Sequence, residues 1–254
     1  MLRRLISPAN SLYPERPSRL SSQCAVCHSW PSQQVCGDCI SRFSPALVRC
    51  KSCALALPAD LSIGLRTSPG LCMDCIKNPP PLDVMLVATS YAYPWSDLIT
   101  RYKFGDQPGW ASFFAGLMFD APDIRQALED LQPGDLIIPM PLSAERLQSR
   151  GFNQAWELAS ALAKLSGSPA SADARLLLRT RDTRPQTELK REARLANVKG
   201  AFQPDPLRLH VVAGKRIVLV DDVVTSGASI FTAALALRAA GAAHVTGMAI
   251  AKTQ

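Results

Sequence analysis

The chain has 254 residues, of which 47% are hydrophobic and 19% are charged, a composition that excludes wholesale disorder and allows one full domain plus a smaller one. No stretch reaches the roughly 20 apolar residues of a membrane-spanning helix, and residues 1–9 are too few for a signal peptide, so we expect a cytoplasmic protein without a membrane span. The formal net charge of +7 favours anionic partners.

Eight cysteines lie near the N-terminus as four Cys-x-x-Cys pairs. A chain without a secretion signal keeps its thiols reduced, which favours metal ligands over disulfides, with redox dithiols as the alternative. Two such pairs complete the shell of four thiolates that Zn2+ prefers, so eight sulfurs predict two zinc sites. The predicted ligands are Cys24, Cys27, Cys36, Cys39, Cys50, Cys53, Cys72 and Cys75.

A shell closed by four thiolates leaves no position for water or substrate, so we assign the metals a structural role. Residues 24–75 contain too few large apolar side chains for a core of their own, and metal binding must supply much of their folding energy. Sequential grouping of the cysteines needs only short hairpins and is favoured over a cross-braced arrangement, which stays open. His28 and His210 are interpreted as ordinary polar residues.

A proline run at residues 79–81 follows the last cysteine and predicts a domain boundary, with a double zinc ribbon over 1–78 and a second domain over 82–254. Beyond it, apolar runs alternate with helical patterns, which predicts an α/β fold with a mainly parallel sheet and helices on both faces. In chain order we expect strand 84–92, helix 95–103, strand 135–140, helix 154–165, strand 176–179, strand 216–220, helix 230–240 and strand 244–251.

Two adjacent carboxylates, Asp221 and Asp222, follow the strand predicted at 216–220, and the small-residue loop from Thr225 to Ser229 then opens a helix. Backbone N–H groups, hydroxyls and a helix N-terminus make such a loop a cradle for phosphate. Carboxylates beside a phosphate suit the vicinal hydroxyls of a ribose or a hydrated Mg2+. The segment therefore suggests a site for ribose 5-phosphate; an acidic strand end followed by a plain turn is the alternative.

Residues 218–229 resemble the signature with which type I phosphoribosyltransferases bind 5-phosphoribosyl-1-pyrophosphate (PRPP). Three further parts resemble the ComF family within that superfamily: residues 102–106, residues 138–142 followed by 150–154, and the segment from Arg181 to Phe202. With the cysteine-rich region in front, the likeness covers nearly the whole chain. It implies a type I phosphoribosyltransferase-like domain behind a double zinc ribbon, a link to competence and DNA uptake, and PRPP with Mg2+ as ligand.

By this resemblance, Asp221 and Asp222 would bind the ribose hydroxyls directly or through Mg2+. The 5-phosphate would be held by Thr225, Ser226, Gly227, Ala228 and Ser229. The turn at Pro141 and Leu142 would face pyrophosphate. A mobile loop would add Arg184, Gln186 and Arg191.

Residues 175–199 hold eight basic and three acidic side chains. Within this segment, the resemblance assigns residues 181–194 to a mobile loop that closes over PRPP; a solvated helix face is the alternative. Phosphoribosyl transfer to an unidentified acceptor is one function, and whether the protein is an enzyme stays undecided. A factor that binds single-stranded DNA is a second, weakened by the lack of aromatic residues in 175–199. A third makes the zinc region a docking module for proteins of the DNA-uptake machinery.

Overall fold

The computed structural model describes residues 22–58, 70–105, 109–180 and 200–254. Their contacts divide the chain into two compact units, Met1–Arg42 and Phe43–Gln254. The predicted domain boundary at 78–82 falls inside the larger unit and stays a prediction. In the smaller unit, a bridge between Ser22 and Ser32 precedes α1 (Gly37–Phe43).

The larger unit is built on a five-stranded sheet in the order β1-β7-β6-β2-β3, and its described neighbours all run parallel. The central strand β6 is fully buried from Ile217 to Val220, as expected of a sheet covered on both faces. The parallel sheet that the sequence predicts is confirmed. The strands are β1 (Val84–Ser90), β2 (Leu136–Pro139), β3 (Ser171–Ala172), β6 (Arg216–Val224) and β7 (His244–Lys252).

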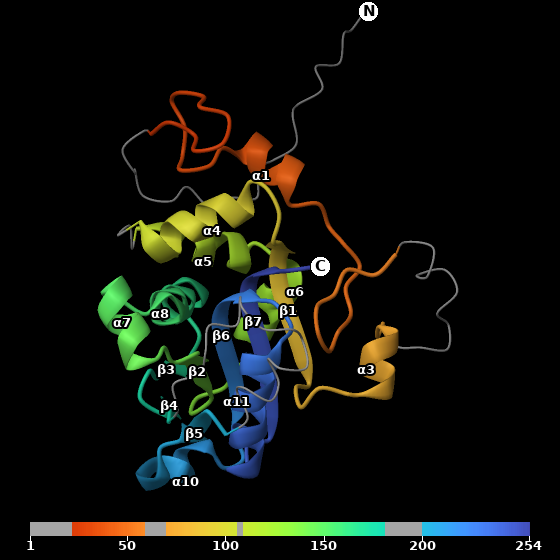
Figure 1. Cartoon of the computed structure of the whole chain (residues 1–254), viewed down its shortest axis with the longest axis vertical. Helices are drawn as coiled ribbons and strands as arrows, with labels where there is room; N and C mark the ends of the chain where they lie inside the picture. The colour runs from red at the N-terminus through yellow and green to blue at the C-terminus, as the bar shows by residue number, and fades with distance from the viewer. Residues whose placement is uncertain (1–21, 59–69, 106–108, 181–199) are drawn as a thin grey trace, which may run out of the picture. The chain divides into compact units, whose positions relative to one another are not determined.

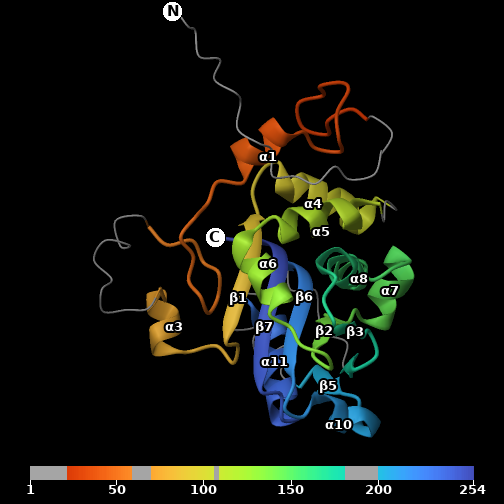
Figure 2. The ribbon, with the colours of Figure 1, turned by 180° about the vertical axis from the view of Figure 1, so that it is seen from behind.

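Helices cover both faces of this sheet, as predicted. Figures 1 and 2 show α11 (Ala228–Ala239) on one face and α6 (Pro122–Glu129) on the other. α5 (Trp110–Phe119) and α8 (Gln154–Ser166) pack on each other, α5 against β7 and α8 against β6. The other helices among the described residues are α3 (Met73–Lys77), α4 (Trp95–Phe104), α7 (Ala144–Arg150), α10 (Leu209–Val212) and the 3-10 turn η2 (Pro206–Arg208).

A second, two-stranded sheet is not hydrogen-bonded to the first but packs in the same core. β4 (Leu177–Arg179) pairs antiparallel with β5 (Phe202–Pro204). The strand expected at 176–179 therefore exists but does not belong to the parallel sheet. Among the described residues, no helix combines the length and hydropathy needed to span a bilayer.

Candidate functional site

The eight cysteines form two clusters of four in sequential order, Cys24 to Cys39 and Cys50 to Cys75, and within each cluster the sulfurs lie within 4.8 Å of one another. The Sγ atoms of Cys27 and Cys36 are 3.6 Å apart, and those of Cys53 and Cys72 are 3.7 Å apart. A tetrahedral shell with metal–sulfur bonds of about 2.3 Å separates its sulfurs by about 3.8 Å. Both clusters thus fit a tetrahedral metal ion, and the sequential grouping is confirmed.

The two clusters repeat one local design. In each, the backbone N–H of a cysteine donates to the first cysteine's sulfur at 3.3 Å, from Cys36 to Cys24 and from Cys72 to Cys50. Burial, helped by the neighbouring sulfurs, raises the pKa of Cys39 to about 12. Hydrogen bonds to Ser29 lower the pKa of Cys27 to about 6, so the first cluster combines a readily ionised thiol with one that a bound cation would keep ionised at neutral pH.

The second cluster is joined to the sheet of the larger unit. The backbone oxygen of Lys51 accepts from the N–H of Met85 in β1 at 2.7 Å. The Arg49 guanidinium donates to the Ser90 hydroxyl at 2.9 Å, near the end of the same strand. Ala54, which directly follows Cys53, is fully buried within the core that includes the sheet residues. This metal site is therefore part of the larger unit's packing.

The carboxyl ends of the central strands converge on one site. The Cα register pairs Pro139 with Val220 and Asp221 with Ala249, so Asp221 and Asp222 emerge just beyond the end of β2. Ligands of open α/β sheets bind at this edge. A cavity of about 560 Å³ opens there, a volume in the range of small-molecule sites.

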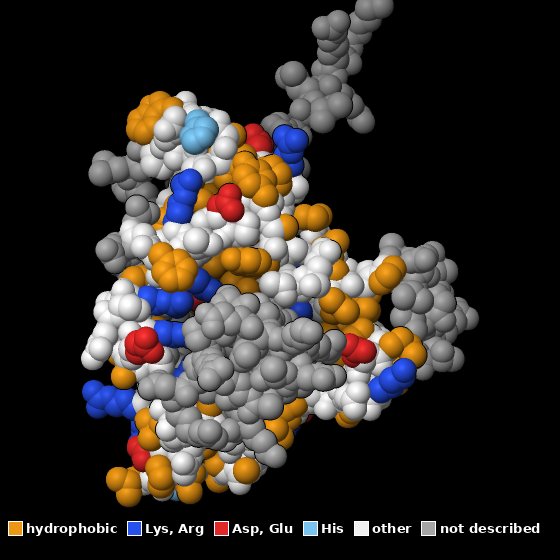
Figure 3. Space-filling view, viewed as in Figure 1, with side chains coloured by type: hydrophobic (Ala, Val, Ile, Leu, Met, Phe, Trp, Pro, Cys, Tyr) orange, Lys and Arg blue, Asp and Glu red, His pale blue; other side chains and the backbone are white. Residues whose placement is uncertain are grey.

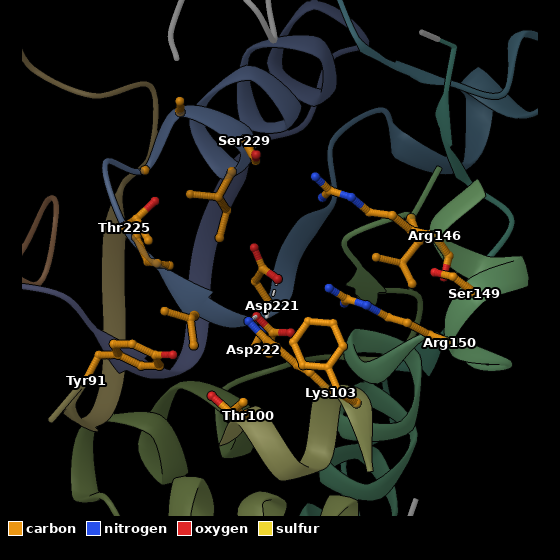
Figure 4. Close-up of a pocket in the computed structure, with 17 residues that line it drawn as sticks. Tyr91, Thr100, Lys103, Arg146, Ser149, Arg150, Asp221, Asp222, Thr225 and Ser229 are labelled. Atoms are coloured by element: carbon orange, nitrogen blue, oxygen red, sulfur yellow. Dashed lines mark hydrogen bonds and ion pairs between the residues drawn. The ribbon is translucent and has the colours of Figure 1, made fainter. Parts of the chain in front are cut away.

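The cavity brings cations and carboxylates together. Figure 4 shows Arg146 and Arg150 extending from α7 toward Asp221, with Thr225 and Ser229 on the other side. Lys and Arg side chains gather around α7 in the space-filling view (Figure 3). Among the described lining residues, Lys103 and the two arginines face only two carboxylates. The excess of positive charge favours an anionic ligand.

The loop before α11 is a tight turn with a glycine in the left-handed conformation. Gly227 caps the helix with φ +82°, a left-handed conformation that suits glycine, and a Cβ there would lie 2.4 Å from the Phe231 ring. The Ser226 hydroxyl accepts from the N–H of Ala228 at 3.4 Å. Below the loop, the Lys252 ammonium donates to the backbone oxygen of Thr225 at 2.7 Å. The predicted residues 225–229 thus form one ordered turn, and all but Ser226 line the cavity.

The acid pair is internally bonded. The N–H of Asp222 donates to Oδ1 of Asp221 at 2.8 Å, and Nζ of Lys103 lies 2.8 Å from Oδ1 of Asp222. Burial and the adjacent Asp222 carboxylate raise the pKa of Asp221 from its ordinary 3.8 to about 7, against the opposing effect of Lys103. Asp221 therefore carries less negative charge at neutral pH than an exposed aspartate would.

Two sequence segments that lie far apart are bonded to each other beside the site. The buried Tyr102 hydroxyl donates to the backbone oxygen of Gln154 at 2.8 Å, and the Arg150 guanidinium stacks 4.9 Å above the Phe104 ring. The Asn153 side chain accepts from the N–H of Ala155 and donates to a backbone oxygen at the end of β2. From these two segments, Lys103, Phe104 and Arg150 line the large cavity, and Asn153 and Gln154 line the smaller adjoining one.

The remaining predicted residues have different outcomes. Leu142 lines the large cavity, and with Pro141 it lines a smaller adjoining one of about 70 Å³. The predicted loop contacts Arg184, Gln186 and Arg191 lie outside the described residues. Sequence reasoning missed Arg146 and Arg150 as site residues, although their i, i+4 spacing puts both on one face of a helix.

Comparison with known proteins identifies relatives over most of the chain, although no family model matches it. The DNA utilization protein YhgH of Salmonella typhimurium is 31% identical over 86% of this chain and 90% of its own length. Competence protein F of Haemophilus influenzae is 30% identical over 68% and 75%, and competence protein ComFC of Streptococcus pneumoniae 27% over 83% and 84%.

Among solved structures, the chain is similar to one titled as the allosteric regulatory enzyme of purine biosynthesis, with 22% identity over 49% of this chain and 25% of that one and a TM-score of 0.29. The relatives named above cover the chain far more fully. Their similarity, together with the two cysteine clusters and the parallel sheet, shows that the chain belongs to the ComF family, the family of competence protein F and the DNA utilization protein YhgH.

Proposed function

We propose that this protein binds PRPP with Mg2+ in the cavity at the carboxyl end of its sheet. The observation that carries the proposal is the juxtaposition of a cradle at residues 225–229 with the carboxylates of Asp221 and Asp222 and the guanidinium groups of α7. The loop would hold the 5-phosphate, the carboxylates would accept from the ribose hydroxyls, and Arg146 and Arg150 would face the pyrophosphate.

Phosphoribosyl transfer is the reaction that such a site would serve. The bond between C1 and the pyrophosphate oxygen would break, pyrophosphate would leave with the bonding electrons, and an acceptor nucleophile would bond to C1. Arg146 and Arg150 would stabilise the charge that develops on the leaving group. Mg2+ would neutralise pyrophosphate and improve it as a leaving group.

Calorimetric titration tests the ligand. We expect saturable binding of PRPP in the presence of Mg2+, and a loss of at least about a hundredfold when Asp221→Asn and Asp222→Asn are combined, since charged hydrogen bonds to two hydroxyls disappear. Asp123→Asn is the control, because this carboxylate is exposed on α6, outside the residues that line the cavity. Absence of binding to the wild type would reject the proposal; binding would justify a screen for the acceptor.

The name of the relative from Salmonella typhimurium, a DNA utilization protein, favours a second function for the cavity and its surroundings. We propose that the site also binds single-stranded DNA, with the arginines of α7 contacting phosphates. Guanidinium groups at i and i+4 can follow a phosphate backbone, and neutralising phosphates releases counterions. The bound strand and PRPP would then compete.

An oligonucleotide titration at several salt concentrations measures this. We expect affinity to fall steeply with salt, and the logarithmic slope to become shallower by about 2 when Arg146→Met and Arg150→Met are combined. Arg125→Met, which removes an arginine of α6 that pairs with Asp120, serves as control and should leave the slope unchanged. Binding that PRPP does not reduce would place DNA elsewhere on the protein.

We further propose that each four-cysteine cluster holds one structural Zn2+, because four sulfurs at tetrahedral separation are the donor set this ion prefers. We also propose that the boundary between the zinc-binding region and the second domain lies at residues 78–82 and that the protein is cytoplasmic. A third proposed function is docking of a DNA-uptake protein on the zinc-binding region.

A further inference from the structure

Lys103 lies in the last turn of α4 and reaches into the cavity (Figure 4). Its ammonium is 2.8 Å from Oδ1 of Asp222. The Lys103 side chain is 19% exposed and that of Asp222 is 11% exposed. The ion pair is therefore largely withdrawn from water. Its two charges interact more strongly than those of an exposed pair.

The position of Lys103 is fixed by its neighbours. Tyr102, fully buried, bonds through its hydroxyl to the backbone oxygen of Gln154, and the Gln154 side chain donates back to the backbone oxygen of Lys103 at 3.5 Å. The backbone that carries the ammonium is thereby bonded to α8. Only the side-chain torsions of Lys103 remain to be ordered when it pairs with Asp222.

One oxygen of each carboxylate is already engaged with a neighbouring group. Oδ1 of Asp222 bonds Lys103, and Oδ1 of Asp221 accepts the N–H of Asp222 at 2.8 Å. Mg2+ requires six oxygen ligands at about 2.0–2.1 Å in near-ideal octahedral geometry. An ion ligated by Asp222 would have to share the carboxylate with an ammonium at contact distance, and two cations so close repel strongly in a half-buried site.

The described residues that line the cavity supply no negative charge beyond the acid pair itself. Of the described residues that line the cavity, Arg146 and Arg150 are cationic, and the acid pair provides the two carboxylates. A dedicated divalent site needs an excess of anionic oxygens, which this lining does not present. Hydroxyl groups, in contrast, can donate to the carboxylate oxygens without adding charge.

We propose that the Lys103 ammonium is the resident counter-ion of Asp221 and Asp222 and keeps divalent cations off these carboxylates, leaving them to accept hydrogen bonds from the vicinal hydroxyls of a ligand. The metal that accompanies PRPP is then held by the ligand's phosphate oxygens and by water. The identity of the ligand rests on the proposed function, whereas the exclusion of metal does not.

The test uses the full chain with its cysteine sites loaded, titrated with Mn2+ alone while free Mn2+ is followed by electron paramagnetic resonance. Mn2+ prefers oxygen ligands and reports the carboxylates without PRPP. We expect wild type and Lys103→Arg to bind no Mn2+ at the pair. Lys103→Met should gain one Mn2+ site at the pair, with an affinity at least about tenfold above any residual binding by the wild type, since the opposing charge is gone. Adding Asp222→Asn should abolish the new site.

One Mn2+ bound to the wild type and lost in Asp222→Asn would overturn the inference, and so would a Lys103→Met protein that folds yet gains no site. Lys103→Gln is a second variant that removes the charge but keeps a hydrogen-bond donor, and circular dichroism checks its fold. A wild type that binds neither PRPP nor Mn2+ would reject the proposed ligand while leaving the counter-ion role of Lys103 intact.

Discussion

Cys50→Ser is expected to destabilise the larger unit by on the order of 5 kcal/mol, because losing one ligand weakens a metal site whose binding energy is folding energy. In a unit of this size, such a change lowers the unfolding midpoint by about 10–20 °C. The destabilisation reaches the sheet because the turn from Cys50 to Cys53 is bonded to β1 through Lys51, and because Ala54 is buried in the core of the sheet. Metal content and thermal unfolding by circular dichroism measure it.

Cys24→Ser is the matched control. Both sulfurs are buried, and each accepts an N–H at 3.3 Å from a later cysteine of its own cluster. Each variant should lose one bound metal per chain. Only Cys50→Ser should shift the unfolding of Phe43–Gln254, because Cys24 belongs to the other unit. Equal shifts in the two variants would show that the clusters do not differ in this way.

Gly227→Ala is expected to abolish phosphate and PRPP binding while costing about 1–2 kcal/mol of stability, the strain of a left-handed conformation for a residue with a Cβ. The added Cβ would lie 2.4 Å from the Phe231 ring, so the ring or the loop must shift. A shifted loop no longer directs its N–H groups at one anion. Calorimetry with PRPP and urea unfolding separate the two effects.

Gly241→Ala provides the comparison at the other end of α11. Its φ is +93°, and a new Cβ would lie 3.5 Å from Ala213, an ordinary contact. It should therefore lose similar stability and keep its affinity for the ligand. Combining Gly227→Ala with Phe231→Ala removes the close contact but not the backbone strain. Full affinity in Gly227→Ala alone would contradict the assignment of this loop to phosphate.

The sequence predicted the sheet well because its strands have strong patterns. The strand at 216–220 and the helix at 230–240 both occur near their expected bounds, and Gly241 after the helix has a left-handed conformation. α5 was missed because eight of its ten residues are buried, which leaves no polar face to reveal a helical period. Strand 176–179 was found, but no local pattern could show that it pairs antiparallel with β5.

The part of the candidate site that belongs to one continuous segment could be predicted from the sequence. Residues 221–229 lie together because strand, loop and helix follow each other in the chain. Lys103, Arg146 and Arg150 were not predicted, because their approach to Asp222 depends on how α4 and α7 pack beside the sheet. The bond between Tyr102 and Gln154 shows the physical reason why two separate segments of the family likeness occur together.

The bond between Met85 and Lys51 has a consequence for self-association. β1 is the outer strand of the sheet, and an outer strand exposes unpaired backbone groups to which another chain can add. The turn from Cys50 to Cys53 occupies one of these groups, the N–H of Met85, at 2.7 Å. Release of its metal would free this group, so we expect a chelated or oxidised protein to pair with other copies through β1 and aggregate.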